Sequence, residues 1–505
     1  MNNNIKQIEN NFLSFVKKII AYNEAVAIMY WDLRTGAPKK GVEQRSEVIG
    51  ILSSEIFQMQ TSEEMKTYLT ALLKEEVKTN LSEVTWKTAL ECQETYDRMK
   101  KIPLAEYQEF VTLQTKAETI WEEAKEKANF AMFQPYLEQL VSMTKKFIDY
   151  WGYKDNKYDT LLHMYEPGLT VETLDRVFLD VRTKLVPLLQ KIQESPNKPN
   201  TDFLYTNFPK EQQKFFSMEI LKQMGYDFAA GRLDETVHPF AIGINPGDVR
   251  VTTKYDENDF RVAIFGTIHE GGHALYEQNI SKELVGTPLA SGASMGIHES
   301  QSLFNEIFVG RSRAFWEYNY ELFKKYAGAQ FDSVPVEEFY RAINEVKRSL
   351  IRIEADELTY PLHIMIRYEI EKALFNDEIE VKDLPEIWNK KYEEYLGITP
   401  DNDGVGVLQD VHWAGGSFGY FPSYALGYMY AAQFKNALLK DIPNFTELLK
   451  TGELLEVKNW FTEKVHQFGK LKKPLEILRD ATGESLNANY LINYLTEKYT
   501  EIYNL

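Results

Sequence analysis

The sequence predicts a mainly α-helical protein of 505 residues with one small β element. Two observations lead to this fold class. Apolar residues recur at helical spacing over residues 1 to about 150, and again from Phe260, with breaks, to the C-terminus. Residues 238–256 differ, because short runs rich in Val, Ile and Thr flank a turn there, as in a β-hairpin. No internal repeat or convincing linker divides the chain, so we expect a single domain over residues 1–505.

Glycine, proline and strand-forming residues predict where the individual elements begin and end. In the N-terminal helical region, residues 31–38 contain a glycine and a proline and should interrupt the helices. Helices resume over about 171–193. The hairpin strands are 240–244 and 249–253, joined by Asn-Pro-Gly-Asp. The largest later break is the Gly/aromatic segment 415–422, which we expect to form a loop.

The composition argues against several classes of partner. Lys and Arg total 57 and Asp and Glu 75, so the net charge is −18. This charge disfavours nucleic acid and anionic membranes as main partners. No apolar run approaches the 18 residues expected of a membrane-spanning helix. The single cysteine, Cys92, cannot form an intrachain disulfide, which fits a cytoplasmic protein.

The most informative motif is His269-Glu270-Gly271-Gly272-His273. Residues four apart lie on one face of a helix, so both imidazoles can bind one zinc ion. Glu270 lies beside the first histidine, where it can accept a proton from an activated water molecule. Glycine is unfavourable inside a helix, so Gly271 and Gly272 suggest that something, such as a substrate backbone, approaches this face closely.

A catalytic zinc ion also needs a third protein ligand and an open position. The residue six positions after the second histidine is Asn279, which excludes a third histidine at that spacing. Glu299 begins an apparent helix that runs to Phe308, and it could present a carboxylate to the ion. Glu277 and Glu306 are alternatives. Glu277 lies too far along the first helix, and Glu306 is better placed as a hydrogen-bond partner of a histidine.

Six ordered motifs resemble those of the carboxypeptidase Taq family of zinc metallocarboxypeptidases. The segment from Trp31 to Arg45 also resembles the family's N-terminal pattern, so the resemblance covers essentially the whole chain. The six motifs are His238-Pro239-Phe240, Asp248-Val249-Arg250-Val251-Thr252, the zinc helix, His298-Glu299-Ser300-Gln301, residues 351–356 (Ile-Arg-Ile-Glu-Ala-Asp) and residues 406–413 (Gly-Val-Leu-Gln-Asp-Val-His-Trp).

The resemblance implies both a fold and an activity. It implies a helical fold with a deep active-site cleft, covered by the N-terminal portion of about 150 residues, and commonly a homodimer. It implies release of single amino acids from free peptide C-termini with broad side-chain preference. By matching positions, His269, His273 and Glu299 become the ligands of one zinc ion, which cobalt could replace, and Glu270 becomes the general base.

Under this interpretation, other motif residues acquire candidate roles in substrate binding. A guanidinium binds a free α-carboxylate through two parallel hydrogen bonds, and Arg250 and Arg352 are the candidates. Asp356 could hold Arg352 if both lie on one helix, four residues apart. His238 begins the hairpin and could line the cleft.

The Gly/aromatic loop offers donors for the negative charge that develops on the carbonyl oxygen during peptide hydrolysis. His412 and one tyrosine, either Tyr420 or Tyr424, are the candidates, and residues 415–419 would allow the loop to close over substrate. Two rival functions stay open at this stage. One is a zinc oligoendopeptidase on a related helical fold. The other is an inactive peptide-binding scaffold with structural zinc, which the presence of Glu270 disfavours.

Overall fold

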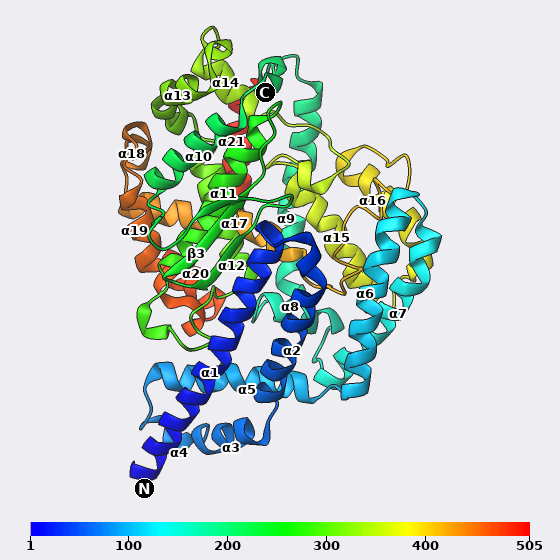
Figure 1. Cartoon of the computed structure of the whole chain (residues 1–505). Helices are drawn as coiled ribbons and strands as arrows, with labels where there is room; N and C mark the ends of the chain where they lie inside the picture. Colours follow the sequence, from blue (N-terminus) through cyan, green and yellow to red (C-terminus); the bar gives the residue numbers. More distant parts are fainter. Residues whose placement is uncertain (1) are drawn as a thin grey trace.

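The computed structural model describes residues 2–505 and confirms the mainly helical fold (Figure 1). In the part of the chain described, no helix has both the length and the apolar character needed to cross a membrane. The helices of the N-terminal region are α1 (Asn2–Thr35), α2 (Val42–Gln60), α3 (Glu63–Leu72), α4 (Glu75–Lys78), α5 (Glu83–Lys100), α6 (Leu104–Glu126) and α7 (Phe130–Trp151).

The later helices include α11, which carries the predicted zinc motif, and the others surround this helix and a small sheet. The later helices are α8 (Lys157–Tyr165), α9 (Val171–Glu194), α10 (Lys210–Met224), α11 (Phe260–Gln278), α12 (Met295–Leu303), α13 (Arg313–Ala327), α14 (Val336–Ile343), α15 (Tyr360–Phe375), α16 (Leu384–Leu396), α17 (Pro422–Asp441), α18 (Phe445–Thr451), α19 (Leu455–Lys464), α20 (Pro474–Thr482) and α21 (Asn489–Tyr503).

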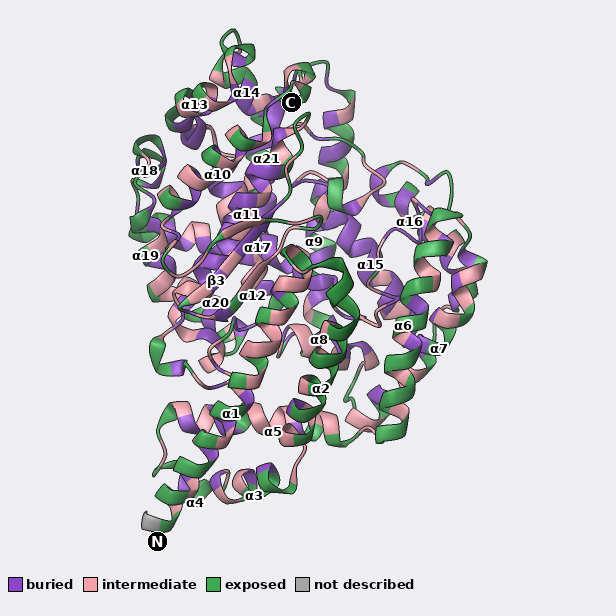
Figure 2. Ribbon diagram, in the orientation of Figure 1, coloured by how far each residue is buried: buried purple, intermediate pink, exposed green. Residues whose placement is uncertain are grey.

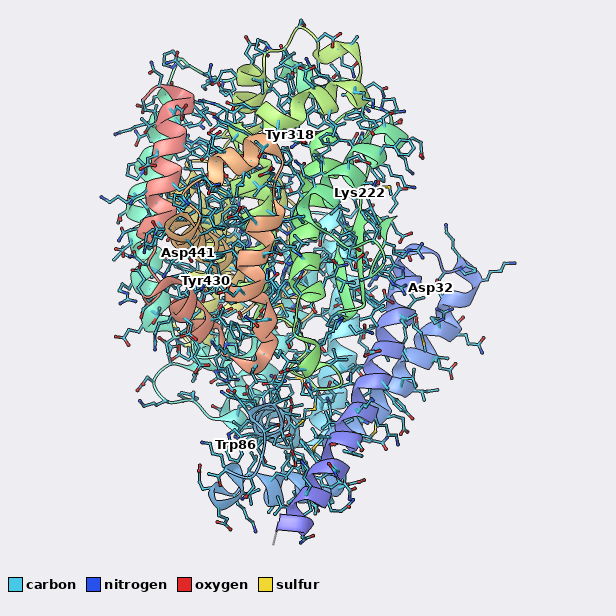
Figure 3. The ribbon with its side chains drawn as sticks, turned by 90° about the vertical axis from the view of Figure 1, so that its left-hand side faces the viewer. Asp32, Trp86, Lys222, Tyr318, Tyr430 and Asp441 are labelled. Atoms are coloured by element: carbon cyan, nitrogen blue, oxygen red, sulfur yellow. The ribbon has the colours of Figure 1, made fainter. Side chains whose placement is uncertain are left out.

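Helices α1, α2, α3 and α5 have a small hydrophobic core of their own. Phe12 and Val16 of α1 pack with Leu69 of α3 and Ala89 of α5, separately from the large core of the later helices. Figure 3 shows α1 along one edge of the molecule, with Asp32 near its upper end. The predicted interruption at residues 31–38 therefore begins later than expected. The helix continues to Thr35, because the residues that break it are the glycine and proline that follow.

The sheet contains the predicted hairpin and one additional strand. β2 (Ala241–Asn245) pairs antiparallel with β3 (Asp248–Thr253), with Ala241 opposite Val251. β1 (Leu233–Glu235) pairs parallel with the other side of β3, which gives the order β1-β3-β2. The sequence did not predict β1, because Leu-Asp-Glu is short and contains no β-branched or aromatic residue. β2 is an edge strand that lies next to α11.

Three buried helices, α11, α12 and α17, form the centre of the molecule (Figure 2). They approach closely because glycines lie at their contacts. A Cβ atom on Gly272 would lie 2.4 Å from the backbone oxygen of Gln301 and 2.6 Å from the Cα of Ser302, both on α12. A Cβ atom on Gly271 would lie 2.6 Å from Leu221 of α10. The suggestion that these glycines admit a substrate backbone is therefore wrong, since neighbouring helices occupy the space.

We predict that Gly272→Ala destabilises the protein. The added methyl group would force α11 and α12 apart, at a cost of about 1–3 kcal/mol for an overpacked core position. Gly50→Ala is the matched control. Gly50 also lies inside a helix, but nothing lies within 4 Å of its added Cβ, so alanine there should stabilise the helix by up to about 1 kcal/mol. Thermal unfolding midpoints test this pair, and a Gly272→Ala variant as stable as wild type would contradict the packing.

Candidate metal centre

Three side chains from two helices meet in a geometry suited to a metal ion. His269 and His273 lie one turn apart on α11, and Glu299 lies on α12. Their possible ligand atoms all lie within 4.8 Å of one another. Glu299 Oε2 is 3.5 Å from His273 Nε2 and 4.0 Å from His269 Nε2. Ligands bound at about 2.1 Å to a tetrahedral zinc ion lie roughly 3–4 Å apart, so these residues fit one ion.

The position of Glu299 depends on how α12 begins and what it packs against. Ser294 caps the helix by accepting a hydrogen bond from the backbone N–H of Ile297. This places Glu299 in the second turn, facing α11. On the other side, α17 presents Gly427, where a Cβ atom would lie 2.5 Å from the Cγ of Glu299. Only glycine at this position leaves room for the glutamate side chain.

His269 receives direct support from a carboxylate. Its Nδ1 lies 3.0 Å from Glu306 Oε2, and Arg311 Nη2 donates to the other oxygen of Glu306 at 2.9 Å. The prediction that Glu306 acts as a histidine partner is confirmed. Glu306 lies in a π-helical segment, η4 (Phe304–Gly310), that directly continues α12. Burial alone would lower the pKa of His269, but Glu299 and Glu306 raise it to about 10. The site therefore favours a cation.

His273 has a different partner. Its Nδ1 lies 2.6 Å from Nδ1 of His298, whose Nε2 lies 2.8 Å from Glu277 Oε1. Burial lowers the pKa of His273 to about 4, which favours the neutral form of the imidazole that a metal ligand requires. Glu277 is not among the metal-binding cluster, as expected from its distance along α11. Sequence reasoning missed the contact of His298, although this residue directly precedes Glu299 in one of the six motifs.

Glu270 is the next residue after the first histidine and lines the same cleft. Burial raises the pKa of its carboxyl group to about 7, although the charge on His269 and a backbone hydrogen bond from Ala241 act in the opposite direction. Ala241 belongs to the edge strand β2. A carboxyl group that titrates near neutral pH beside a metal site is suited to accept and release a proton.

The metal-binding cluster opens onto a cleft of about 1480 Å³, as the cleft-containing fold predicts. Side chains from widely separated parts of the chain line it. The N-terminal region contributes α5 through Glu91, Glu94 and Arg98. His163 also lines the cleft, and its Nε2 lies 3.2 Å from Glu94.

Arg352 lines the cleft, and its side chain is only 5% exposed. Its Nη2 donates to Asp410 Oδ1 at 2.7 Å, and its Nη1 donates to the hydroxyl of Tyr360. The predicted support from Asp356 is wrong. Arg352 lies in a single 3-10 turn, η6 (Arg352–Glu354), and α15 begins only at Tyr360, so no α-helix joins the two residues. Asp356 instead accepts backbone N–H groups, including that of Thr359.

Arg250 and His238 lie outside the residues that line this cleft. Side chains alternate along a strand, and Val249 and Val251 are fully buried in the core, so Arg250 points to the opposite face of β3. There it pairs with Asp248 at 2.7 Å and stacks over the ring of Trp31, in a separate pocket. His238 is exposed just before β2.

The predicted donors lie close together, but His412 is not among the residues that line the cleft. Tyr420 and Tyr424 line it, with ring centroids 5.2 Å apart. His412 Nε2 lies 3.3 Å from the hydroxyl of Tyr424, and burial lowers the pKa of His412 to about 4. Tyr360 of α15 and Tyr428, one turn after Tyr424 on α17, also line the cleft. The sequence did not predict them because neither belongs to one of the six motifs or to the Gly/aromatic loop.

The sequence profile of the carboxypeptidase Taq (M32) metallopeptidase family matches residues 11–499. The chain belongs to this family. It is 57% identical to carboxypeptidase 1 of Bacillus subtilis (strain 168), over 99% of this chain and 100% of that protein. It is 39% identical to thermostable carboxypeptidase 1 of Thermus thermophilus, over 98% of each. The crystal structure of the M32 carboxypeptidase from Deinococcus radiodurans R1 matches it with a TM-score of 0.95 and 33% identity, covering 99% of this chain and 100% of that one.

Membership of the M32 family makes the chain a metallocarboxypeptidase, with the metal site formed by His269, His273 and Glu299. The suggested alternatives, an oligoendopeptidase or an inactive scaffold, are therefore not adopted.

We predict that Glu299→Ala loses bound metal. With only two imidazoles left as ligands, the metal affinity should fall by more than about 100-fold. Losing only an outer hydrogen-bond partner of a ligand typically lowers metal affinity by roughly 10- to 100-fold. Glu345→Ala removes another cleft carboxylate, one that pairs with Lys347, and should keep its metal. Metal-to-protein ratios after dialysis against a chelator test both variants. Equal retention by Glu299→Ala and wild type would contradict the ligand assignment.

Proposed function

We propose that the chain is a zinc-dependent carboxypeptidase that removes single amino acids from peptides with a free C-terminus, with broad side-chain preference. The observation that carries this proposal is the pairing of a His/His/Glu cluster with Glu270 at the floor of one cleft. Two imidazoles and one carboxylate, with one position left open, form a ligand set typical of catalytic zinc. The same ligands could accept cobalt.

The residues around the cluster suggest how hydrolysis proceeds. When bound, the metal ion supplies the Lewis acidity that makes a water molecule nucleophilic at neutral pH. Glu270 accepts the proton of this water and later delivers it to the leaving amine. The hydroxyl groups of Tyr420 and Tyr424 line the cleft and are the candidate donors to the carbonyl oxygen as its negative charge develops. His412 would act through Tyr424, because its Nε2 lies 3.3 Å from the Tyr424 hydroxyl.

We predict that Glu270→Gln retains metal but loses about 10²- to 10⁴-fold in kcat, the usual contribution of a general base. Glutamine has almost the same shape and Glu270 is not a ligand, so metal content should match wild type. Glu283→Gln, on the exposed surface beyond α11, is the matched control and should retain full activity. Turnover close to wild type in Glu270→Gln would exclude the proposed proton transfer.

We further propose that Arg352 binds the substrate's terminal carboxylate. A guanidinium has five N–H groups, and those of Arg352 make three hydrogen bonds, two to Asp410 and one to Tyr360. Two N–H groups, one on each terminal nitrogen, stay available in a fork that matches a carboxylate. Arg250 has less support for this role, since Asp248 occupies its guanidinium outside the cleft.

We predict that wild type cleaves a free-acid peptide about 10- to 100-fold faster, in kcat/KM, than its C-terminally amidated twin, because the amide cannot form a charged hydrogen bond. Arg352→Lys should narrow this ratio, since a lysine offers no planar fork. Equal cleavage of the two peptides by wild type would contradict recognition of the C-terminus. An unchanged ratio in Arg352→Lys, at equal metal content, would assign the carboxylate to another residue.

We also propose that the N-terminal helical region covers the cleft and acts with the rest of the chain as one unit, supported by the α5 side chains that line the cleft. The homodimer and the cytoplasmic location expected from the sequence stay predictions.

A further inference from the structure

His298 and Glu277 form a hydrogen-bonded pair directly behind His273. His298 Nδ1 lies 2.6 Å from His273 Nδ1, and His298 Nε2 lies 2.8 Å from Glu277 Oε1. Neither residue belongs to the metal-binding cluster. We propose that Glu277 and His298 are positioning residues that fix the tautomer and the ring orientation of the metal ligand His273.

The position of the ring hydrogen of His273 determines how the two imidazoles pair. Its Nε2 faces Glu299 and must keep a free lone pair to bind a metal ion, so the hydrogen of this neutral ring has to lie on Nδ1. That hydrogen points at Nδ1 of His298. Two ring nitrogens 2.6 Å apart can share only one hydrogen, so His298 accepts through Nδ1 and carries its own hydrogen on Nε2.

Glu277 selects this arrangement over the opposite one. A carboxylate accepts hydrogen bonds, so it pairs with His298 only when the Nε2 of His298 carries a hydrogen. In the opposite arrangement, the hydrogen of His298 would lie on Nδ1 and that of His273 on Nε2. The carboxylate would then face a bare nitrogen lone pair, and Nε2 of His273 could not bind a metal ion.

The surroundings hold the pair in place. Glu277 Oε1 also accepts the backbone N–H of Gly292 at 3.1 Å, and the ring of Tyr276 packs 5.1 Å from that of His298. Two glycines leave the necessary space. A Cβ atom on Gly292 would lie 2.5 Å from His298, and one on Gly243 of strand β2 would lie 2.6 Å from Glu277. The pair therefore lies in the wall of the cleft, held by α11, β2 and the segment before α12.

The two histidine ligands thus differ in how their tautomers are fixed. For His269 the carboxylate of Glu306 contacts the ligand directly. For His273 the carboxylate lies one imidazole away, because Glu277 is four residues further along the same helix and His298 of α12 fills the gap. Outer hydrogen-bond partners of metal-binding histidines typically contribute about 10- to 100-fold to metal affinity. We expect His298 to contribute a factor in this range.

The test compares two substitutions of nearly equal size, His298→Leu and His298→Asn. Leucine removes the acceptor, so zinc should bind about 10- to 100-fold more weakly than to wild type. Asparagine can present a carbonyl oxygen close to the position of Nδ1, and an oxygen can only accept, so zinc affinity should stay within about threefold of wild type. His163→Leu, whose histidine pairs with Glu94 on the cleft wall, is the control and should bind zinc like wild type.

Zinc affinity is measured by competition with a chromophoric chelator, and the unfolding midpoint of each metal-free variant is recorded. The proposal requires a difference in zinc affinity between His298→Leu and His298→Asn at similar metal-free stability. Wild-type zinc affinity in His298→Leu, or equal losses in both variants, would overturn it. The proposal rests on the proposed metal site, but it does not depend on which metal is native, because the test uses the ratio of each variant's zinc affinity to that of wild type. Weak zinc binding by wild type would instead count against zinc as the native metal.

Discussion

The distance between helices α11 and α12 determines whether this protein can hold a metal ion. His269 and His273 lie one turn apart on α11, so their imidazoles face the same ion. The third ligand, Glu299, comes from another helix, and its carboxylate must come within about 4 Å of both imidazoles. Side chains of ordinary size would keep the helices further apart. Gly272 on α11 lets the backbone of α12 approach at Gln301 and Ser302, and Gly427 on α17 leaves room for the Glu299 side chain. The buried core around them then fixes the spacing, since such interiors have little freedom to relax.

The electrostatics of the centre follow from the same burial. Glu270, Glu299 and Glu306 lie close together and largely shielded from solvent at the cleft, which is unfavourable for three carboxylates unless positive charge is nearby. Arg311 supplies part of that positive charge, and the raised pKa of His269 shows that the carboxylates favour further positive charge at the centre. A divalent cation bound at the centre would supply this positive charge. The Arg352 site is built differently, because Asp410 joins Arg352 to the fully buried Arg367 and both arginines hold the pKa of Asp410 well below its usual range.

Local patterns predicted the features that depend on local geometry. The pair His269/His273, the hairpin and the π-segment partner Glu306 could be anticipated, because helical and strand periodicity place such residues without knowledge of the whole fold. Glu299 was expected from its position and from the family resemblance together. Features that depend on contacts between distant segments were missed or misplaced. Neither the helix contacts of Gly271 and Gly272 nor the 3-10 turn at Arg352 leaves a sequence signal, and Arg250 faces away from the cleft only because β3 packs as it does.

The most direct test of this account is anomalous X-ray diffraction from crystals of the zinc-loaded protein, recorded on both sides of the zinc absorption edge. The account predicts one strong peak per chain, about 2.0–2.2 Å from Nε2 of His269, Nε2 of His273 and a carboxylate oxygen of Glu299, and no contact with Glu277 or Glu306. A peak bound by either of those outer carboxylates in place of Glu299, or a peak elsewhere in the molecule with none between α11 and α12, would contradict it.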